Sequence, residues 1–222
     1  MLVSDEFLTI FSISSSGAKL IETVPWGADN FEKTISNIIA KDCGKKPVLI
    51  VNDMVEQHYR KERVVKTGVS FVDKSSMVAR KLNVAFPNYS IRAAYPLKEK
   101  IPKTDSQPAA DVYIFAAVAN TDQITQTVSA TKKSLASVAG FCLLPVEASD
   151  MVKALSTKMA KKGRKKNTWS IFIGQHRNGS LRQVLTKNGE LALTRMSPMT
   201  ESDDNPEVWA QELYNEFKST MS

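Results

Sequence analysis

The sequence predicts an α/β fold with mixed sheets and flanking helices, and three patterns in its 222 residues support this class. Apolar and polar residues alternate in paired stretches near both ends of the chain, as in β-hairpins. An unbroken apolar run occupies residues 111–119, as expected for a strand covered on both faces. Other segments repeat apolar residues at helical spacing. Strands and helices therefore alternate through most of the chain, which is typical of an α/β domain.

The first part of the chain predicts short elements in close succession. Ser15, Ser16 and Gly17 form the turn between the first two strands, and Gly44 ends the first helix, for which Asp29-Asn30 is the expected cap. The residues after Val55 are charged and alternate with apolar ones, which indicates a strand or extended edge. The expected elements are strands at 7–14 and 19–25, a helix at 31–42, a strand at 47–52, an extended edge at 55–69, a helix at 74–82 and a strand at 89–95.

The middle of the chain predicts a loop followed by strand, helix, strand and helix. Residues 96–110 are rich in Pro and Lys and poor in large apolar residues, so we expect a solvated loop before the apolar strand. Thr121 is the expected N-cap of a helix with apolar residues at helical spacing, and Gly140 its end. The helical positions are Ile124, Val128, Thr131, Leu135 and Val138, and the last two elements are a strand at 141–146 and a helix from Ala148 to about Met159.

The segment from Trp169 to Arg195 predicts a three-stranded meander. Its second turn is Asn188-Gly189, the strongest short-range hairpin signal, because a type I′ turn needs positive φ at both central residues. A final helix begins at Asn205-Pro206-Glu207, which supplies an Asn cap, Pro at the first helical position and an acidic first turn. The strands of the meander are expected at 169–174, 180–186 and 190–195.

Composition predicts a cytosolic chain with a real core. Hydrophobic residues make up 42% of the sequence, no run approaches the roughly 18 to 20 apolar residues that cross a bilayer, and the first residues do not resemble a signal peptide. Cys43 and Cys142 lie far apart and outside any metal-binding spacing. Reduced thiols are therefore expected, and no disulfide framework.

The net charge of +7 comes largely from a basic tract at residues 153–166, which has seven Lys and Arg residues and no acidic one. A solvated linker explains this composition. A surface facing anionic lipid headgroups or an acidic partner explains it as well. A nucleic-acid surface is least favoured, because aromatic residues are not interleaved with the basic ones.

The stretch from Trp169 to Met199 resembles the start of the second half of an actin-like ATPase. It looks more narrowly like the cytoplasmic domains of type IV pilus and type II secretion assembly-platform proteins of the PilM and GspL type, with Ile173-Gly174, Gly189 and Arg195 at comparable places. The element order before it is close to the ribonuclease-H-like half of such a fold. The resemblance implies an actin-like (ribonuclease-H-like) fold with a first subdomain at 1–160 and the start of a second at 161–222, with a membrane segment after Ser222 left open.

Actin-like ATPases hold nucleotide between two hairpins, each with an Asp for Mg²⁺ and small residues near the phosphates. At the corresponding places the first hairpin here has Ser12 and Ser14, with Lys19 at the usual spacing, and the second has Phe172 before a retained Gly174. Serine and phenylalanine cannot hold Mg²⁺ as carboxylates do. The chain is therefore expected to have no catalytic residues, no cofactor and no metal, although an acid such as Asp5 would matter if the comparison is shifted.

Other active sites are not indicated. His58 and His176 have no nucleophile motif beside them, and the sequence lacks the P-loop, G-x-S-x-G and HExxH patterns. Ribonuclease-H-like nucleases need carboxylates on the first strand, and residues 7–14 contain none.

The leading hypothesis is a non-catalytic scaffold on the cytoplasmic side of a bacterial inner membrane. By resemblance it would dock the assembly ATPase and platform proteins, and an anionic membrane surface and a homodimer are further options. The alternatives are an active ATPase or kinase of the same fold and a basic nucleic-acid-binding module. The exposed candidates for partner binding are Arg60, Lys61 and Arg63 on the extended edge, and Lys161, Lys162, Arg164, Lys165 and Lys166 in the basic tract.

Overall fold

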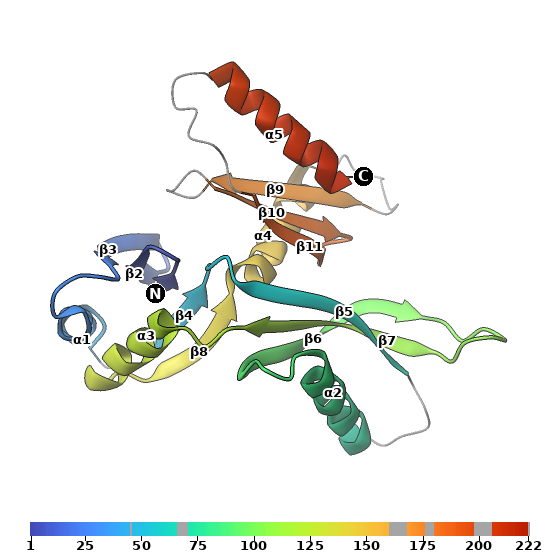
Figure 1. The fold of residues 1–222 in the computed structure, drawn as a ribbon, viewed down its shortest axis with the longest axis horizontal. Helices are drawn as coiled ribbons and strands as arrows, with labels where there is room; N and C mark the ends of the chain where they lie inside the picture. Colours follow the sequence, from blue (N-terminus) through green and yellow to red (C-terminus); the bar gives the residue numbers. More distant parts are fainter. Residues whose placement is uncertain (45, 66–70, 160–167, 176–179, 198–205, 222) are drawn as a thin grey trace. The chain divides into compact units, whose positions relative to one another are not determined.

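A computed structural model describes residues 1–44, 46–65, 71–159, 168–175, 180–197 and 206–221 (Figure 1). The chain divides into two compact units, Met1–Leu143 and Leu144–Ser222. The boundary between the compact units precedes helix α4 (Leu144–Met159) in the sequence, whereas the predicted subdomain boundary, between residues 160 and 161, follows this helix. Within the described ranges, no helix combines the length and apolar character that crossing a membrane requires.

The first unit contains a five-stranded sheet with two helices. Its elements are β1 (Leu2–Val3), β2 (Phe7–Ser14), β3 (Gly17–Pro25), α1 (Phe31–Asp42), β4 (Val48–Asn52), α3 (Asp122–Lys133) and β8 (Val138–Leu143). The strand order is β3-β2-β1-β4-β8, in which β3, β2 and β1 are antiparallel and β1, β4 and β8 are parallel. Helices α1 and α3 pack against each other. The core includes Val3, Leu8, Ile10, Ile35, Ile39 and Ile50, all almost fully buried.

The two predicted helix caps have different outcomes. Thr121 is confirmed as the cap of α3, because its Oγ1 accepts the N–H of Ile124 at 3.4 Å. Asn30 precedes α1 as predicted, but its side chain makes no capping hydrogen bond. Its backbone is left-handed (φ 55°, ψ 31°), a conformation that Asn tolerates in turns, whereas a capping residue is normally extended. Neither Cys43 nor Cys142 takes part in a disulfide.

A second sheet is inserted between β4 and α3. Its elements are β5 (Gln57–Val65), α2 (Phe71–Ala85), β6 (Ile91–Ile101) and β7 (Ala110–Val118), in the antiparallel order β5-β7-β6. The apolar run predicted as a doubly covered strand is confirmed, because β7 is the central strand and is buried throughout. Helix α2 packs on one face, where Met77, Val78 and Leu82 contact a cluster that includes Val64 and Phe115.

The predicted loop at 96–110 is wrong at its start, because β6 continues to Ile101. Its pairing with β7 shifts register between Pro96 and Lys100 and then resumes. Proline removes one N–H from the ladder, and β6 is an edge strand that tolerates this loss. The charged segment predicted as an extended edge is confirmed as edge strand β5.

A buried carboxylate joins α2 to this sheet. Asp111 is 5% exposed, and its two oxygens lie 2.5 Å from Lys74 Nζ and 2.7 Å from Lys100 Nζ. The hydrogen bond to Asp111 raises the pKa of the Lys74 ammonium group. A carboxylate this deeply buried needs such partners, because removing a charge from water is costly.

The helix predicted to end at Gly140 ends at Lys133, and the strand predicted at 141–146 lies at 138–143. The helix stops because Leu135 has φ 61° and the Ser134 hydroxyl donates to the Thr131 carbonyl at 2.6 Å. Residues from Val138 onward pair with β4 instead. Helix α4 consequently starts at Leu144, with Pro145 in its first turn, rather than at Ala148.

The second unit confirms the predicted meander. Its elements after α4 are β9 (Trp169–Gln175), β10 (Leu181–Lys187), β11 (Glu190–Ser197) and α5 (Pro206–Met221). Asn188 and Gly189 have φ values of 55° and 77°, as a type I′ turn requires. Helix α4 packs against all three strands. Helix α5 is tied to the meander by polar contacts, in which Thr220 donates to Gln183 at 2.6 Å and Ser197 to Glu216 at 2.7 Å.

Candidate functional site

The first candidate loop lies at the tip of the β2–β3 hairpin. Ser12 pairs with Lys19 and Ser14 with Gly17, and all four residues are exposed. The Ser14 hydroxyl lies 2.8 Å from that of Ser16 and donates to the Gly17 carbonyl at 3.3 Å. A Cβ added at Gly17 would meet no atom within 4 Å. The tip is therefore open and lined with hydroxyl groups, which are poor substitutes for the carboxylate that Mg²⁺ prefers.

The second candidate loop begins on β9, where Phe172 pairs with Val184 and Gly174 with Arg182. A Cβ added at Gly174 would lie 2.9 Å from the Phe172 ring, so the ring covers the glycine backbone. The Phe172 ring therefore fills the space beside the Gly174 backbone. His176 lies outside the described residues.

No metal cluster is found in the part of the chain that the structure describes, where His, Cys, Asp and Glu side chains do not gather in threes. Asp5, the acid that a shifted comparison would bring into the first hairpin, has a structural contact. Its Oδ2 accepts the N–H of Val55 at 2.9 Å. This bond joins the segment before β2 to the segment after β4.

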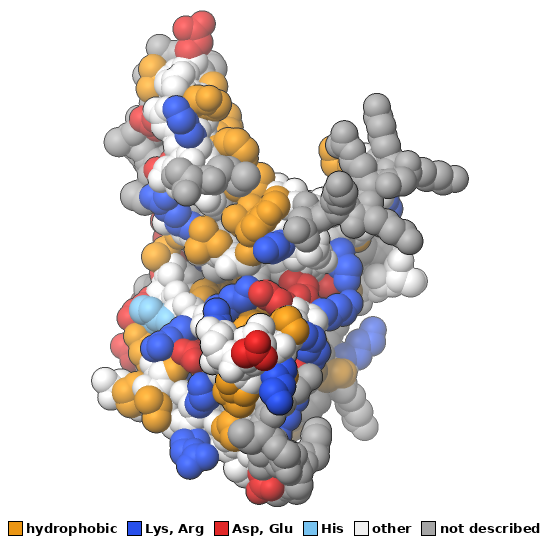
Figure 2. Space-filling model, turned by 90° about the vertical axis from the view of Figure 1, so that its right-hand side faces the viewer, with side chains coloured by type: hydrophobic (Ala, Val, Ile, Leu, Met, Phe, Trp, Pro, Cys, Tyr) orange, Lys and Arg blue, Asp and Glu red, His pale blue; other side chains and the backbone are white. Residues whose placement is uncertain are grey.

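The three basic candidates on β5 do not form one surface. Successive strand residues point to opposite faces, so Lys61 and Arg63 share a face and Arg60 lies on the other. Two of them are paired with acids, Arg60 with Glu62 at 2.5 Å and Lys61 with Glu99 at 2.5 Å. On the face shown in Figure 2, basic side chains are likewise interspersed with acidic ones. The candidates of the basic tract, Lys161, Lys162, Arg164, Lys165 and Lys166, lie outside the described residues.

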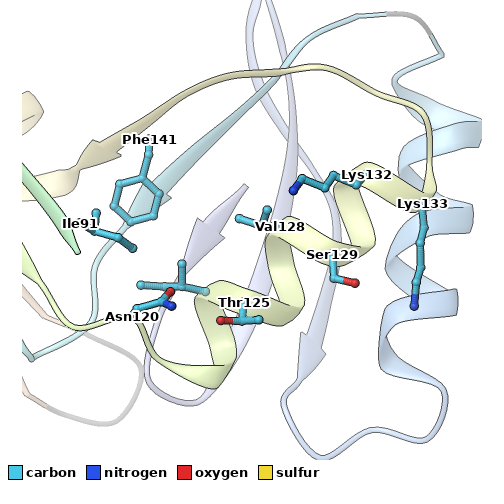
Figure 3. A pocket seen from close by; sticks show the side chains of 9 residues that line it. Ile91, Asn120, Thr125, Val128, Ser129, Lys132, Lys133 and Phe141 are labelled. Carbon is cyan, nitrogen blue, oxygen red and sulfur yellow. The ribbon is translucent and has the colours of Figure 1, made fainter. Parts of the chain in front are cut away.

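The structure adds a groove beside α3 that the sequence does not indicate (Figure 3). Its volume is about 570 Å³. Figure 3 shows Val128 facing Ile91 and Phe141, with Lys132 reaching toward the groove and Lys133 turned away. Lys133 pairs with Glu32 on α1. The lining residues come from β6, the connection before α3, α3 and β8, and are Ile91, Asn120, Ile124, Thr125, Val128, Ser129, Lys132, Lys133 and Phe141.

The groove runs beside an edge strand, β8, that has no charged residue or proline to discourage pairing with another strand. Strand β8 is at the end of its sheet, its sequence VAGFCL has neither charge nor proline, and its first two residues are exposed. The opposite edge, β3, contains Lys19, Glu22 and Pro25, which discourage pairing with another strand. Phe141 belongs both to β8 and to the groove lining. An extended segment could therefore pair with β8 and place side chains in the groove.

The sequence misses this groove because its residues are far apart in the chain and look like core. Val128 fits the same helical pattern as Thr131, which is buried away from the groove, yet Val128 is half-buried and lines the groove. The uncharged run at 138–143 was a usable signal, since natural edge strands are rarely without charge or proline. Recognising it required knowing that this strand is at an edge.

No protein-family model matches the chain, and no curated protein matches its sequence. Among solved structures, a chain of the PilM–PilN type IV pilus biogenesis complex matches 91% of this chain, with a TM-score of 0.57 and 12% identity. The chain shares the fold of PilM. It spans 61% of the length of that PilM structure. The fold class predicted from the sequence, and the resemblance to the PilM type, are therefore confirmed at the level of fold.

Two further matches have lower TM-scores. A Bacteroides thetaiotaomicron protein described as having an actin-like ATPase fold and unknown function matches 98% of this chain and 75% of its own length, at 10% identity and a TM-score of 0.45. The cytoplasmic domain of EpsL, an inner-membrane component of the type II secretion system of Vibrio cholerae, matches 92% of this chain and 76% of its own length. Its identity is 9% and its TM-score is 0.42.

Proposed function

We propose that this chain is a non-catalytic, actin-like scaffold of a bacterial pilus or secretion platform, positioned on the cytoplasmic side of the inner membrane. The observation that carries the proposal is the combination of the PilM fold with Phe172 packed over Gly174, where a metal-binding carboxylate is expected. A fold of this kind without its metal ligands keeps its surfaces for binding other proteins.

The non-catalytic part of the proposal follows from the chemistry of phosphoryl transfer. Such transfer depends on Mg²⁺ to offset the charge that develops on the phosphate oxygens. Ser12 and Ser14 offer hydroxyl groups at an exposed tip, and Phe172 offers an aromatic ring. Neither position supplies the charged oxygen ligand that holds Mg²⁺ near a nucleotide.

The partner proposed for the groove is a platform protein. The solved PilM structure is a complex with PilN, and we propose that a segment of a comparable platform protein lies along β8 here. Strand addition supplies main-chain hydrogen bonds, and alternate side chains then enter pockets. Val128, Ile91 and Phe141 suit apolar side chains, and Lys132 at the other end favours an acidic one.

Docking of the assembly ATPase is proposed on the remaining basic surface. Lys61 and Arg63 share one face of β5, opposite the face that α2 covers. The basic tract is the second candidate for this contact, and an anionic membrane surface is its alternative ligand.

Calorimetric titration with ATP and Mg²⁺, alongside a phosphate-release assay, tests whether the chain binds and hydrolyses ATP. We expect neither binding heat nor phosphate release. Micromolar binding with turnover would refute the non-catalytic proposal, and binding without turnover would replace it with a nucleotide-gated adaptor.

A pull-down with the PilN-type platform protein and the assembly ATPase of the same bacterium tests the docking surfaces. Val128→Glu places a charge in the groove and is expected to abolish capture of the platform protein. Val84→Glu is the matched control, because Val84 is 77% exposed on α2 and lies outside the groove. Charge reversal at Lys161, Lys162, Arg164, Lys165 and Lys166 is expected to weaken ATPase capture, and unchanged capture would remove the tract from the proposal.

A further inference from the structure

The turn between α3 and β8 presents an exposed apolar side chain on a strained backbone. Leu135 is 94% exposed and has φ 61°, the left-handed region that residues other than Gly, Asn and Asp rarely adopt. A leucine here gains nothing from burial and adds backbone strain. Strained residues that persist in this way are concentrated at functional positions.

Hydrogen bonds hold this turn in one shape. The Leu135 N–H donates to the Lys132 carbonyl at 3.1 Å, and the Ser134 hydroxyl donates to the Thr131 carbonyl at 2.6 Å. The Ala136 N–H in turn donates to the Ser134 hydroxyl at 3.4 Å. Thr131, Ser134 and Ala136 are buried, so Leu135 projects from a fixed base.

The surroundings of Leu135 are apolar and basic. Val138 is 41% exposed, and Lys132 is exposed at the end of α3. The N–H of Val48 donates to the Ser137 carbonyl at 2.8 Å, which brings the segment containing exposed Lys46 to the same end of the sheet. The sequence has no acidic residue between Asp122 and Glu147, and the acidic residue that contacts the end of α3, Glu32, is paired with Lys133. This end of the sheet therefore combines a protruding apolar group with positive charge.

We propose that the turn at residues 134–138 contacts an anionic lipid surface. Leu135 enters the boundary between headgroups and acyl chains, while Lys132 and Lys46 contact lipid phosphates. Membrane binding of this kind depends on buried apolar area together with attraction to anionic lipids. A single projecting side chain needs no shaped pocket in a fluid interface, which favours lipid over a protein partner. The contact goes beyond the proposed scaffold function and does not depend on it.

Co-sedimentation with vesicles of phosphatidylglycerol and phosphatidylcholine, compared with phosphatidylcholine alone, tests this contact. The full chain is expected to sediment with the anionic vesicles and to be released by salt. Leu135→Asn keeps a residue that tolerates positive φ and removes the apolar group. It is expected to lower partitioning by about tenfold, since burial of one leucine is worth at least a factor of this size.

Two further variants separate the contact from general effects. Leu135→Phe retains an apolar side chain and is expected to bind as strongly as the unmodified chain. Ile13→Asn is the matched control, because Ile13 is 73% exposed at the serine-rich tip of the β2–β3 hairpin, and it is expected to leave binding unchanged. The proposal is overturned if the unmodified chain stays in the supernatant. It is also overturned if Leu135→Asn sediments like the unmodified chain, since another surface then makes the contact.

Discussion

The β2–β3 hairpin of the first unit and the β9–β10 pair of the second differ in how their glycines are surrounded. The first unit puts small hydroxyl side chains at an exposed tip, and the space beside Gly17 is empty. The second unit fills the corresponding space with the Phe172 ring, which lies against Gly174. The glycine of the first hairpin therefore has no packing around it, whereas the glycine of the second has an aromatic ring against it. The first position is therefore tolerant of change and the second is not.

The largest effect is expected from Phe172→Asp. The substitution removes a half-buried ring and places a carboxylate against β10, so it should lower the free energy of unfolding by about 3 kcal/mol. Chemical denaturation followed by circular dichroism measures the loss, and hydrogen exchange should localise it to the meander. A loss below about 1 kcal/mol would show that the ring contributes little packing and that the contrast between the hairpins is wrong.

Gly189→Ala is expected to cost about 2 kcal/mol, because an alanine is strained at φ 77° and its Cβ needs the space that the Lys153 methylenes fill. Gly17→Ala is the matched variant in the open hairpin. It is also strained, at φ 131°, but meets no neighbouring atom, so about 1 kcal/mol is expected. Comparison of the two denaturation midpoints measures the difference. Equal losses would mean that Lys153 moves aside freely.

Gly174→Ala is expected to cost about 1 kcal/mol, because its Cβ would lie 2.9 Å from the Phe172 ring. The same substitution in a Phe172→Ala background should cost almost nothing. A double-mutant cycle measures this coupling directly. Additive losses would show that the ring does not restrict residue 174.

Ser12→Asp is expected to change the free energy of unfolding by less than about 0.5 kcal/mol, because the side chain is exposed and nothing packs on it. The Ser12→Asp variant is also expected not to bind Mg²⁺ in a calorimetric titration, since one exposed carboxylate is not a magnesium site. Micromolar Mg²⁺ binding by this variant would show that the rest of a metal site has been kept.

Local signals in the sequence were sufficient where one turn or cap determines the structure. Asn188-Gly189 specified its hairpin, Thr121 its helix cap and Pro206 the first residue of α5. Each depends on the backbone preference of one or two residues, which neighbours in the chain do not alter.

The sequence could not indicate which strands belong to which sheet. Residues 55–119 read as successive strands and a helix of one domain, yet they form a sheet of their own, because strand pairing joins residues far apart in the chain. The helical pattern also failed at its end. Leu135 and Val138 continue the spacing of Ile124 and Thr131, but a left-handed residue stops the helix before them. The groove beside β8 was missed for the same reason, since only the assembled sheet shows that β8 is its edge.

The inserted sheet begins and ends at one point of the five-stranded sheet. Gln57, its first residue, pairs in register with Val118, its last, and the Gln57 side chain donates to the carbonyls of Asn52 and Met54 at 3.2 and 2.8 Å. Because the two ends of the inserted segment are held together, a change in its length alters the entropy of loop closure only slightly. The stability of the five-stranded sheet therefore depends little on the length of the insertion. Residues 58–117 thus form an insertion that is structurally separable from the five-stranded sheet. A change in the length of this segment therefore leaves the five-stranded sheet from which it emerges intact.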